Sequence, residues 1–116
     1  MEVRCIGFIP PVVGVEGEFN TLRLGGVLFK ALNPGDEVFL LDERKKIVFG
    51  KAVVTKLDNG PINEMCAMHG HMNHTQLALD PAHSAEGLYK VVQKIYGPHI
   101  VQPHKNATVV YLKRTE

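Results

Sequence analysis

The sequence predicts an α+β domain whose mostly antiparallel strands close into a small β-barrel accompanied by two helices. Short valine-rich runs alternate with turns of glycine, proline and asparagine, which is the usual pattern of β-strands. Two segments in the C-terminal half have the spacing and end signals of helices. With so few strands, closing the sheet into a barrel plugged by a helix would bury both of its faces.

Length and composition indicate one domain covering residues 1–116. The chain has 116 residues, of which 45% are apolar and 22% charged, as in a typical globular domain. The formal net charge is only +1. Because affinity for long nucleic acids comes largely from neutralising phosphates, this balance argues against a long nucleic-acid track. A local basic patch or a small nucleoside pocket remains compatible with it.

Cysteine content and hydropathy predict a cytoplasmic protein without a membrane partner. Cys5 and Cys66 are too few and too far apart for a disulfide scaffold, so reduced thiols are expected. The first residues contain no apolar core of a signal peptide. No run approaches the roughly 18 apolar residues of a membrane span.

The first strands are expected near the N-terminus. Residues 1–8 form a strand that Pro10 and Pro11 interrupt, and residues 19–24 follow a glycine-containing loop. Residues 27–32 are short and apolar and fit either a strand or a helical turn.

A hairpin is expected next. Residues 33–36, with the sequence Asn-Pro-Gly-Asp, form a turn that leads into a strand over 37–41. The second arm covers 47–57, and Gly50 within it indicates a bulge or bend. The charged tip, residues 42–46, either grips phosphates or is simply a solvated loop.

The C-terminal half is expected to supply two helices and a closing strand. Residues 58–60 end the hairpin arm, and a short helix runs from Pro61 to His69. A longer helix over 84–96 is capped by Ser84 and ended by glycine and proline. Its apolar stripe, at helical spacing, consists of Leu88, Val91, Val92 and Ile95. A last strand over 107–114 would pair back into the sheet, beside the first.

These segments together resemble the ASCH domain of the PUA-like β-barrel superfamily. The resemblance is carried, in order, by residues 21–25, 34–38, 49–53 and 95–97, and it extends from about residue 21 to residue 114. It implies a PUA-like barrel with a cleft between barrel and helices that takes RNA or modified nucleosides. No cofactor is expected.

Some ASCH proteins resemble enzymes, and the resemblance leaves catalysis open. The acetylcytidine amidohydrolases have a Lys-x-x-Thr-x-Arg pattern followed later by a glutamate. Thr21 and Arg23 match the threonine and arginine, but Glu18 stands where the lysine would be and the nearest later acid is Asp80. Thr21 would be a nucleophile only with an adjacent base, for which Glu18 or a histidine is the candidate.

Three residues of the strand regions are candidates for ligand binding. Thr21 and Arg23 lie two residues apart, so on an extended segment they share a face. Arg23 could bind a phosphate or stack on a base, and Thr21 could donate a hydrogen bond. Lys51 has small neighbours that leave room for a ligand. The alternatives are that Arg23 holds a carboxylate, Thr21 caps a turn and Lys51 is simply exposed.

Cysteine and histidine gather in one nine-residue stretch. Cys66, His69, His71 and His74 are of zinc-ligand type, but the expected helix end divides them and their close spacing would strain a tetrahedral site, so no metal is expected. The histidines could instead line the cleft, His74 foremost, or be exposed to solvent. Asn73 beside it could donate a further hydrogen bond.

The sequence therefore predicts binding of RNA or a modified nucleoside. The cleft would be lined by Thr21, Arg23, Lys51, His71, Asn73 and His74. One alternative is a small hydrolase, either an amidohydrolase acting on an acylated nucleoside or a ribonuclease. Another is a protein-interaction module without a ligand, which predicts an apolar surface patch and no polar cleft.

Overall fold

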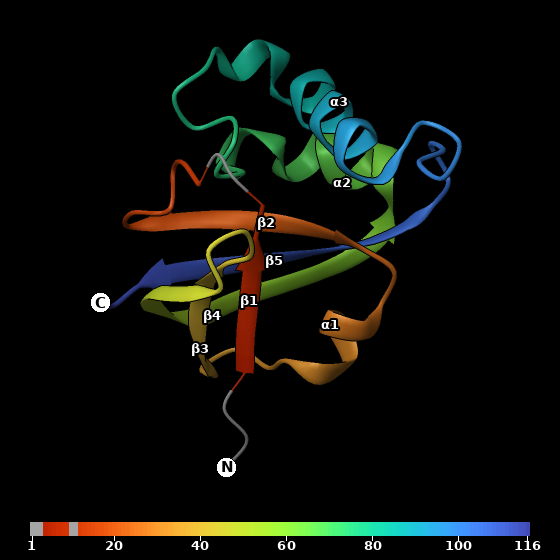
Figure 1. The fold of residues 1–116 in the computed structure, drawn as a ribbon. Coiled ribbons are helices and arrows are strands. Elements are labelled where there is room, and N and C mark those ends of the chain that lie inside the picture. The colour runs from red at the N-terminus through yellow and green to blue at the C-terminus, as the bar shows by residue number, and fades with distance from the viewer. Residues whose placement is uncertain (1–3, 10–11) are drawn as a thin grey trace.

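The computed structural model describes residues 4–9 and 12–116, which form a five-stranded sheet with the helices of residues 62–69 and 84–96 on one face (Figure 1). Residues 1–3 and the two prolines expected to interrupt the first strand lie outside the described residues. The α+β class is confirmed. In chain order the elements are β1 (Arg4–Phe8), β2 (Glu18–Leu24), α1 (Val27–Ala31), β3 (Glu37–Asp42), β4 (Ile47–Pro61), α2 (Ile62–His69), the 3₁₀ turns η1 (Gly70–Met72) and η2 (Pro81–His83), α3 (Ser84–Tyr96) and β5 (Asn106–Arg114).

The strands form one sheet in the order β1-β3-β4-β5-β2. The β1–β3 pair is parallel and the other three pairs are antiparallel. The expected closure into a barrel is wrong. Within the described part of the chain, the edge strands β1 and β2 share no backbone ladder, and they run in clearly different directions where they meet (Figure 1). The last strand lies between β4 and β2 rather than beside β1.

Two bulges shape the long strand β4. The register with β3 shifts next to Gly50, where the sequence predicted a bulge or bend, and the register with β5 shifts between Val54 and Lys56. Because a bulge bends its strand and increases the local twist, β4 can curve around the core and pair with both neighbours. This curvature brings the two open edges of the sheet toward each other.

The sheet buries a hydrophobic cluster on each face. On β5, Val110 and Leu112 point into the cluster enclosed by the curved sheet, whereas Ala107 and Val109 point toward α2 and α3. This alternation follows the two-residue period of a strand. Fully burying such a side chain stabilises the fold by about 1.5–3 kcal/mol. Strand β5 therefore contributes side chains to both clusters.

Several element ends differ from the sequence prediction. The turn-forming residues 58–60 remain in β4, because they pair with β5 and Asn59 Nδ2 donates to Thr108 Oγ1 over 2.9 Å. Ser84 is the first residue of α3 rather than its cap, and its hydroxyl donates to the Pro81 carbonyl. Of residues 27–32, which fitted either a strand or a helical turn, Val27–Ala31 form α1. No helix among the described residues combines the length and apolar character needed to cross a membrane.

Candidate functional site

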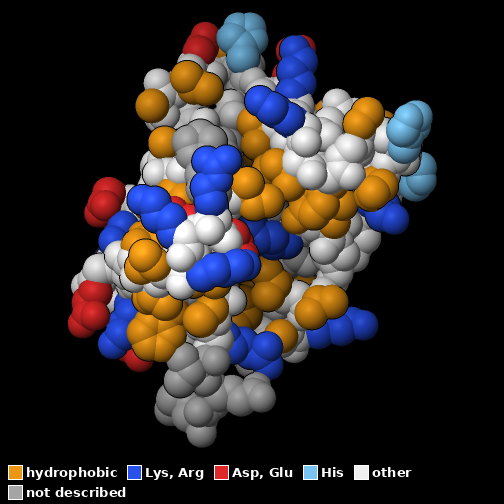
Figure 2. All heavy atoms as spheres, viewed as in Figure 1, with side chains coloured by type: hydrophobic (Ala, Val, Ile, Leu, Met, Phe, Trp, Pro, Cys, Tyr) orange, Lys and Arg blue, Asp and Glu red, His pale blue; other side chains and the backbone are white. Residues whose placement is uncertain are grey.

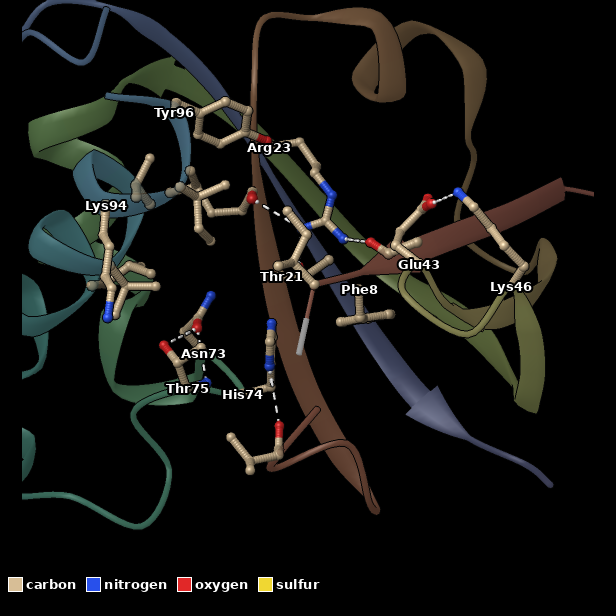
Figure 3. A pocket seen from close by; sticks show the side chains of 18 residues that line it. Phe8, Thr21, Arg23, Glu43, Lys46, Asn73, His74, Thr75, Lys94 and Tyr96 are labelled. Atoms are coloured by element: carbon tan, nitrogen blue, oxygen red, sulfur yellow. Dashed lines mark hydrogen bonds and ion pairs between the residues drawn. The ribbon is translucent and has the colours of Figure 1, made fainter. Parts of the chain in front are cut away.

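A cavity of about 960 Å³ lies between α3 and the open edge of the sheet where β1 and β2 meet (Figure 3). The tip of the β3–β4 hairpin and the loop after η1 also contribute side chains to it. On this face of the molecule, Lys and Arg side chains lie next to apolar ones around a hollow (Figure 2). Its polar or charged lining residues are Thr21, Arg23, Glu43, Lys46, Asn73, His74, Thr75, Lys94 and Tyr96.

Arg23 joins the two edge strands across the opening. Its Nη1 donates to Thr21 Oγ1 over 2.5 Å and to the Leu22 carbonyl over 3.1 Å, and its Nη2 donates to the carbonyl of Gly7 on β1. The guanidinium lies 5.3 Å from the centroid of the Phe8 ring. Burial lowers the pKa of Arg23, but an arginine remains charged in proteins. A guanidinium has five N–H donors, and partners within the described residues use three of them.

Thr21 lies beside Arg23 as the shared face of an extended strand requires, but Glu18 does not join them. Thr21 is completely buried, and its hydroxyl accepts the hydrogen bond from Arg23. Glu18 is exposed at the start of β2 and is absent from the cavity wall. The reason is the odd separation, which places Glu18 and Thr21 on opposite faces of the strand. In the part of the chain described here, no carboxylate or imidazole hydrogen-bonds to the Thr21 hydroxyl.

The loop after η1 is fastened to β2 through buried amides. Asn20 Nδ2 donates to the His69 carbonyl over 2.9 Å, and the Asn20 carbonyl accepts from the His74 backbone N–H over 3.0 Å. Asn73 Nδ2 donates to Asn20 Oδ1 over 3.3 Å. Both the backbone N–H and the hydroxyl of Thr75 donate to Asn73 Oδ1. Buried amides satisfied in this way rigidify a loop, so Asn73 and His74 have fixed positions in the cavity wall.

His74 is held on one side of its ring. Nδ1 lies 3.1 Å from the Val13 carbonyl oxygen, and the ring packs edge-on against Phe8 and Phe19 with centroids 5.0 Å and 6.3 Å away. Burial, and to a smaller extent the charge of Arg23, lowers the pKa of His74 to about 4, although the bond to Val13 opposes this shift. The imidazole is therefore neutral at neutral pH.

Two predicted ligand-binding residues lie elsewhere. Lys51 extends over the Phe39 ring, 5.4 Å from its centroid, and its Nζ is 3.7 Å from a carboxylate oxygen of Glu116. His71 is exposed in η1. Neither belongs to the cavity wall.

The clustered cysteine and histidines do not converge either. Cys66 is buried in the apolar cluster beneath the helices, and burial raises the pKa of its thiol to about 11. Both ring nitrogens of His69 are already bonded, Nε2 to Asp58 Oδ2 and Nδ1 to the Tyr111 hydroxyl, each over 2.7 Å. Among the residues that the structure describes, no group of three or more His, Cys, Asp or Glu side chains could hold a metal ion.

Sequence reasoning missed part of the cavity wall. At the hairpin tip, Lys46 Nζ pairs with Glu43 Oε2 over 2.8 Å, and both residues line the cavity. The charged tip was predicted from the sequence, but nothing in the sequence shows that it folds over the β1–β2 edge. The apolar stripe of α3 also lines the cavity, and Ile95 on it remains 44% exposed. A helix stripe only partly covered by the protein is a signal of a ligand-sized opening.

The curved open sheet, with α2 and α3 on one face and the cavity at its open edge, makes up a fold that is similar to that of an ASCH protein. No known family model and no curated protein matches the sequence. Similarity is found instead in solved structures, and it confirms the predicted resemblance as a resemblance of fold.

Three solved structures illustrate the shared fold. The hypothetical protein PH0355 matches with a TM-score of 0.65 and 17% identity, covering 98% of this chain and 100% of that one. A point mutant of ZmASCH from Zymomonas mobilis matches with a TM-score of 0.59 and 16% identity over 97% of this chain and 70% of its own. Protein EF3133 of Enterococcus faecalis V583, of family DUF984, matches with a TM-score of 0.60 and 12% identity over 90% of this chain. The match spans 64% of the Enterococcus protein.

Proposed function

We propose that this protein binds RNA or a modified nucleoside, with one nucleoside held in the cavity between α3 and the β1–β2 edge. A volume of about 960 Å³ accommodates a nucleoside and lies within the usual range of small-molecule sites. The likeness to an ASCH protein supports the same class of ligand at the level of fold.

The observation that carries the proposal is the convergence of Thr21, Arg23, Asn73 and His74 on one cavity. They come from two separate parts of the chain, and two of them, Thr21 and Asn73, were expected to form hydrogen bonds with a ligand. Opposite them lies the partly uncovered apolar stripe of α3. A flat base needs this combination, because its faces are apolar and its edge carries donors and acceptors.

The charges around the cavity fit a short contact with phosphate. Lys46 and Lys94 line the cavity on different sides, with Arg23 between them (Figure 3). Glu43 neutralises part of this charge through its pair with Lys46. With a formal net charge of +1, longer RNA should bind weakly and with strong dependence on salt.

The two alternatives receive less support. An interaction module without a ligand predicts no polar cleft, and the cavity has polar side chains on several sides. A hydrolase using Thr21 needs a base within hydrogen-bond reach, and the Thr21 hydroxyl accepts from Arg23 instead. Incubation with acetylcytidine followed by analysis for cytidine tests that alternative directly.

The proposal is tested by NMR titration of the protein with the four ribonucleosides and short RNA oligomers. We expect shifts centred on β2, α3 and the loop after η1, and loss of binding in Arg23→Ala. Because Arg23 also joins β1 to β2, Arg23→Lys is measured in parallel to retain the charge. The control is Arg44→Ala, because Arg44 is an exposed arginine at the tip of the β3–β4 hairpin and does not line the cavity. Unchanged affinity in Arg23→Ala, or equal loss in the control, would contradict the assignment.

A further inference from the structure

We propose that His74 Nε2 is a hydrogen-bond acceptor that selects ligands by their Watson–Crick edge, and that Arg23 supplies the complementary donors. A bound base would present an N–H to His74 and an adjacent acceptor to Arg23. The ligand would then be an unpaired base that still has the N–H donor of its Watson–Crick edge. This inference rests on the proposed function and narrows its ligand class.

The bond to Val13 fixes which nitrogen carries the proton. A carbonyl oxygen can only accept, so the 3.1 Å contact requires that His74 Nδ1 donates. A neutral imidazole has one N–H, and Nε2 is therefore left with a free lone pair. Figure 3 shows the Val13 bond on one side of the ring and the other nitrogen directed into the cavity, toward Thr21.

The surroundings keep the imidazole in this neutral form. The ring is packed against two phenylalanines, where a charge would lose its hydration, and the guanidinium of Arg23 repels a second positive charge. The lowered pKa of His74 agrees with this geometry. Across the physiological pH range the cavity thus presents an acceptor at His74.

In this proposal Arg23, which contacts the same Phe8 ring as His74, supplies the donors. Both side chains pack against Phe8, with the His74 ring 5.0 Å and the Arg23 guanidinium 5.3 Å from its centroid. Arg23 has two N–H donors that the described residues do not use. An acceptor beside donors complements a ligand edge that carries a donor beside an acceptor. Each nucleobase presents such an edge where it would pair with another base.

The test compares nucleosides that differ by methylation. Uridine is titrated beside 3-methyluridine, which lacks the edge donor, and 5-methyluridine, which has the same added methyl group away from that edge. The same set for cytidine uses N4,N4-dimethylcytidine and 5-methylcytidine. For a base that binds, we expect removal of the donor to weaken binding at least about tenfold and the control methyl group to have little effect. Equal affinity of all three forms overturns this inference while leaving nucleoside binding intact.

A protein variant assigns the effect to His74. His74→Phe retains an aromatic ring against Phe8 but has no acceptor, so it should bind the parent nucleoside and its donor-lacking analogue equally. His74→Gln restores an acceptor and should recover part of the discrimination. Both variants are checked for folding by backbone NMR spectra before titration. Discrimination that persists in His74→Phe overturns the assignment, and absence of binding to any ribonucleoside overturns the proposed function together with it.

Discussion

His69 and His74 come from the same short stretch of sequence, yet their surroundings are opposite. His69 lies between the sheet and α2 with both ring nitrogens bonded, one to Asp58 and one to Tyr111. His74 lies at the β1–β2 edge, where one nitrogen is bonded to Val13 and the other faces the cavity. The number of protein partners, rather than burial alone, separates a histidine that holds the fold together from one that is available to a ligand.

The electrostatics of the two regions differ in the same way. The hydrogen bond from His69 is the main reason that the pKa of Asp58 is lowered, so that pair stabilises the charged carboxylate. At His74, burial and a neighbouring guanidinium disfavour charge. The hydrogen bond around His69 therefore stabilises a charged carboxylate, whereas the surroundings of His74 stabilise a neutral imidazole.

The largest effect on stability is expected from removing the hydrogen bonds of His69 to Asp58 and Tyr111. His69→Ala leaves Asp58 and Tyr111 without their shared partner and opens a void between sheet and helix, since His69 is only 3% exposed. We expect a loss of about 3 kcal/mol in the free energy of unfolding, measured in urea. His71→Ala, an exposed histidine nearby, should change stability by less than about 0.5 kcal/mol. Similar losses in both variants would remove the distinction.

The pH dependence of stability should reveal the neutral state of His74. Its pKa is about 4 in the folded protein against an ordinary value of 6.5, so between these values the unfolded chain binds more protons. The contribution is complete above pH 6.5 and is lost as the pH falls toward about 4. It amounts to at most about 3 kcal/mol at 1.36 kcal/mol per pKa unit. Urea unfolding of the wild type and His74→Phe across this range should give diverging profiles, and parallel profiles would contradict the shift.

Two glycines in the β1–β2 loop form a matched pair that tests the position of the His74 loop. Gly14 and Gly17 both have positive φ, at 65° and 63°. A Cβ on Gly14 would collide with the backbone carbonyl of His74, whereas one on Gly17 meets nothing within 4 Å. We expect Gly17→Ala to cost about 1 kcal/mol through backbone strain alone, and Gly14→Ala about 2 kcal/mol or more with shifted His74 NMR signals. Equal costs without those shifts would show that the two loops are not in contact.

The smallest effect on stability is expected at the rim of the cavity. Lys46 and Glu43 form an ion pair whose side chains are 73% and 40% exposed, and such pairs contribute little in water. Lys46→Ala should change the free energy of unfolding by less than about 0.5 kcal/mol. Binding of short RNA should nevertheless weaken and become less dependent on salt, which fluorescence titration at two ionic strengths would measure.

Local sequence patterns predicted most elements, but the predicted closure of the sheet into a barrel is wrong. The hairpin arms, α3 and the last strand follow from periodicity and turn residues, because these are local signals. The residues 58–60 were misassigned, since their turn chemistry is outweighed by pairing with β5 and by the hydrogen bonds of Asn59. The open edge between β1 and β2 depends on the twist of five strands together, for which a sequence carries no local signal.

The grouping of residues in the cavity wall could be predicted where strand geometry or an adjacent loop decided it. Thr21 and Arg23 are brought together by the two-residue period of a strand, and Asn73 and His74 by neighbouring positions in one loop. The placement of Lys51 failed because small neighbours do not determine which face of the sheet holds the cavity. The contributions of the hairpin tip and the α3 stripe depend on contacts between distant segments, so sequence periodicity alone could not reveal them.

The position of β5 makes assembly of the cavity depend on completion of the sheet. Among the strands of the described residues, the edge strand β2, which carries Thr21 and Arg23, has β5 as its one neighbour in the sheet. Thr21 lies opposite Val110. Such distant pairings close late and slow the folding of β-rich domains. A partly folded chain lacking the β2–β5 ladder has no assembled cavity, so the proposed ligand would stabilise the finished domain alone. The concentration of that ligand would then act on the folding equilibrium by mass action, as RT ln(1 + [L]/Kd).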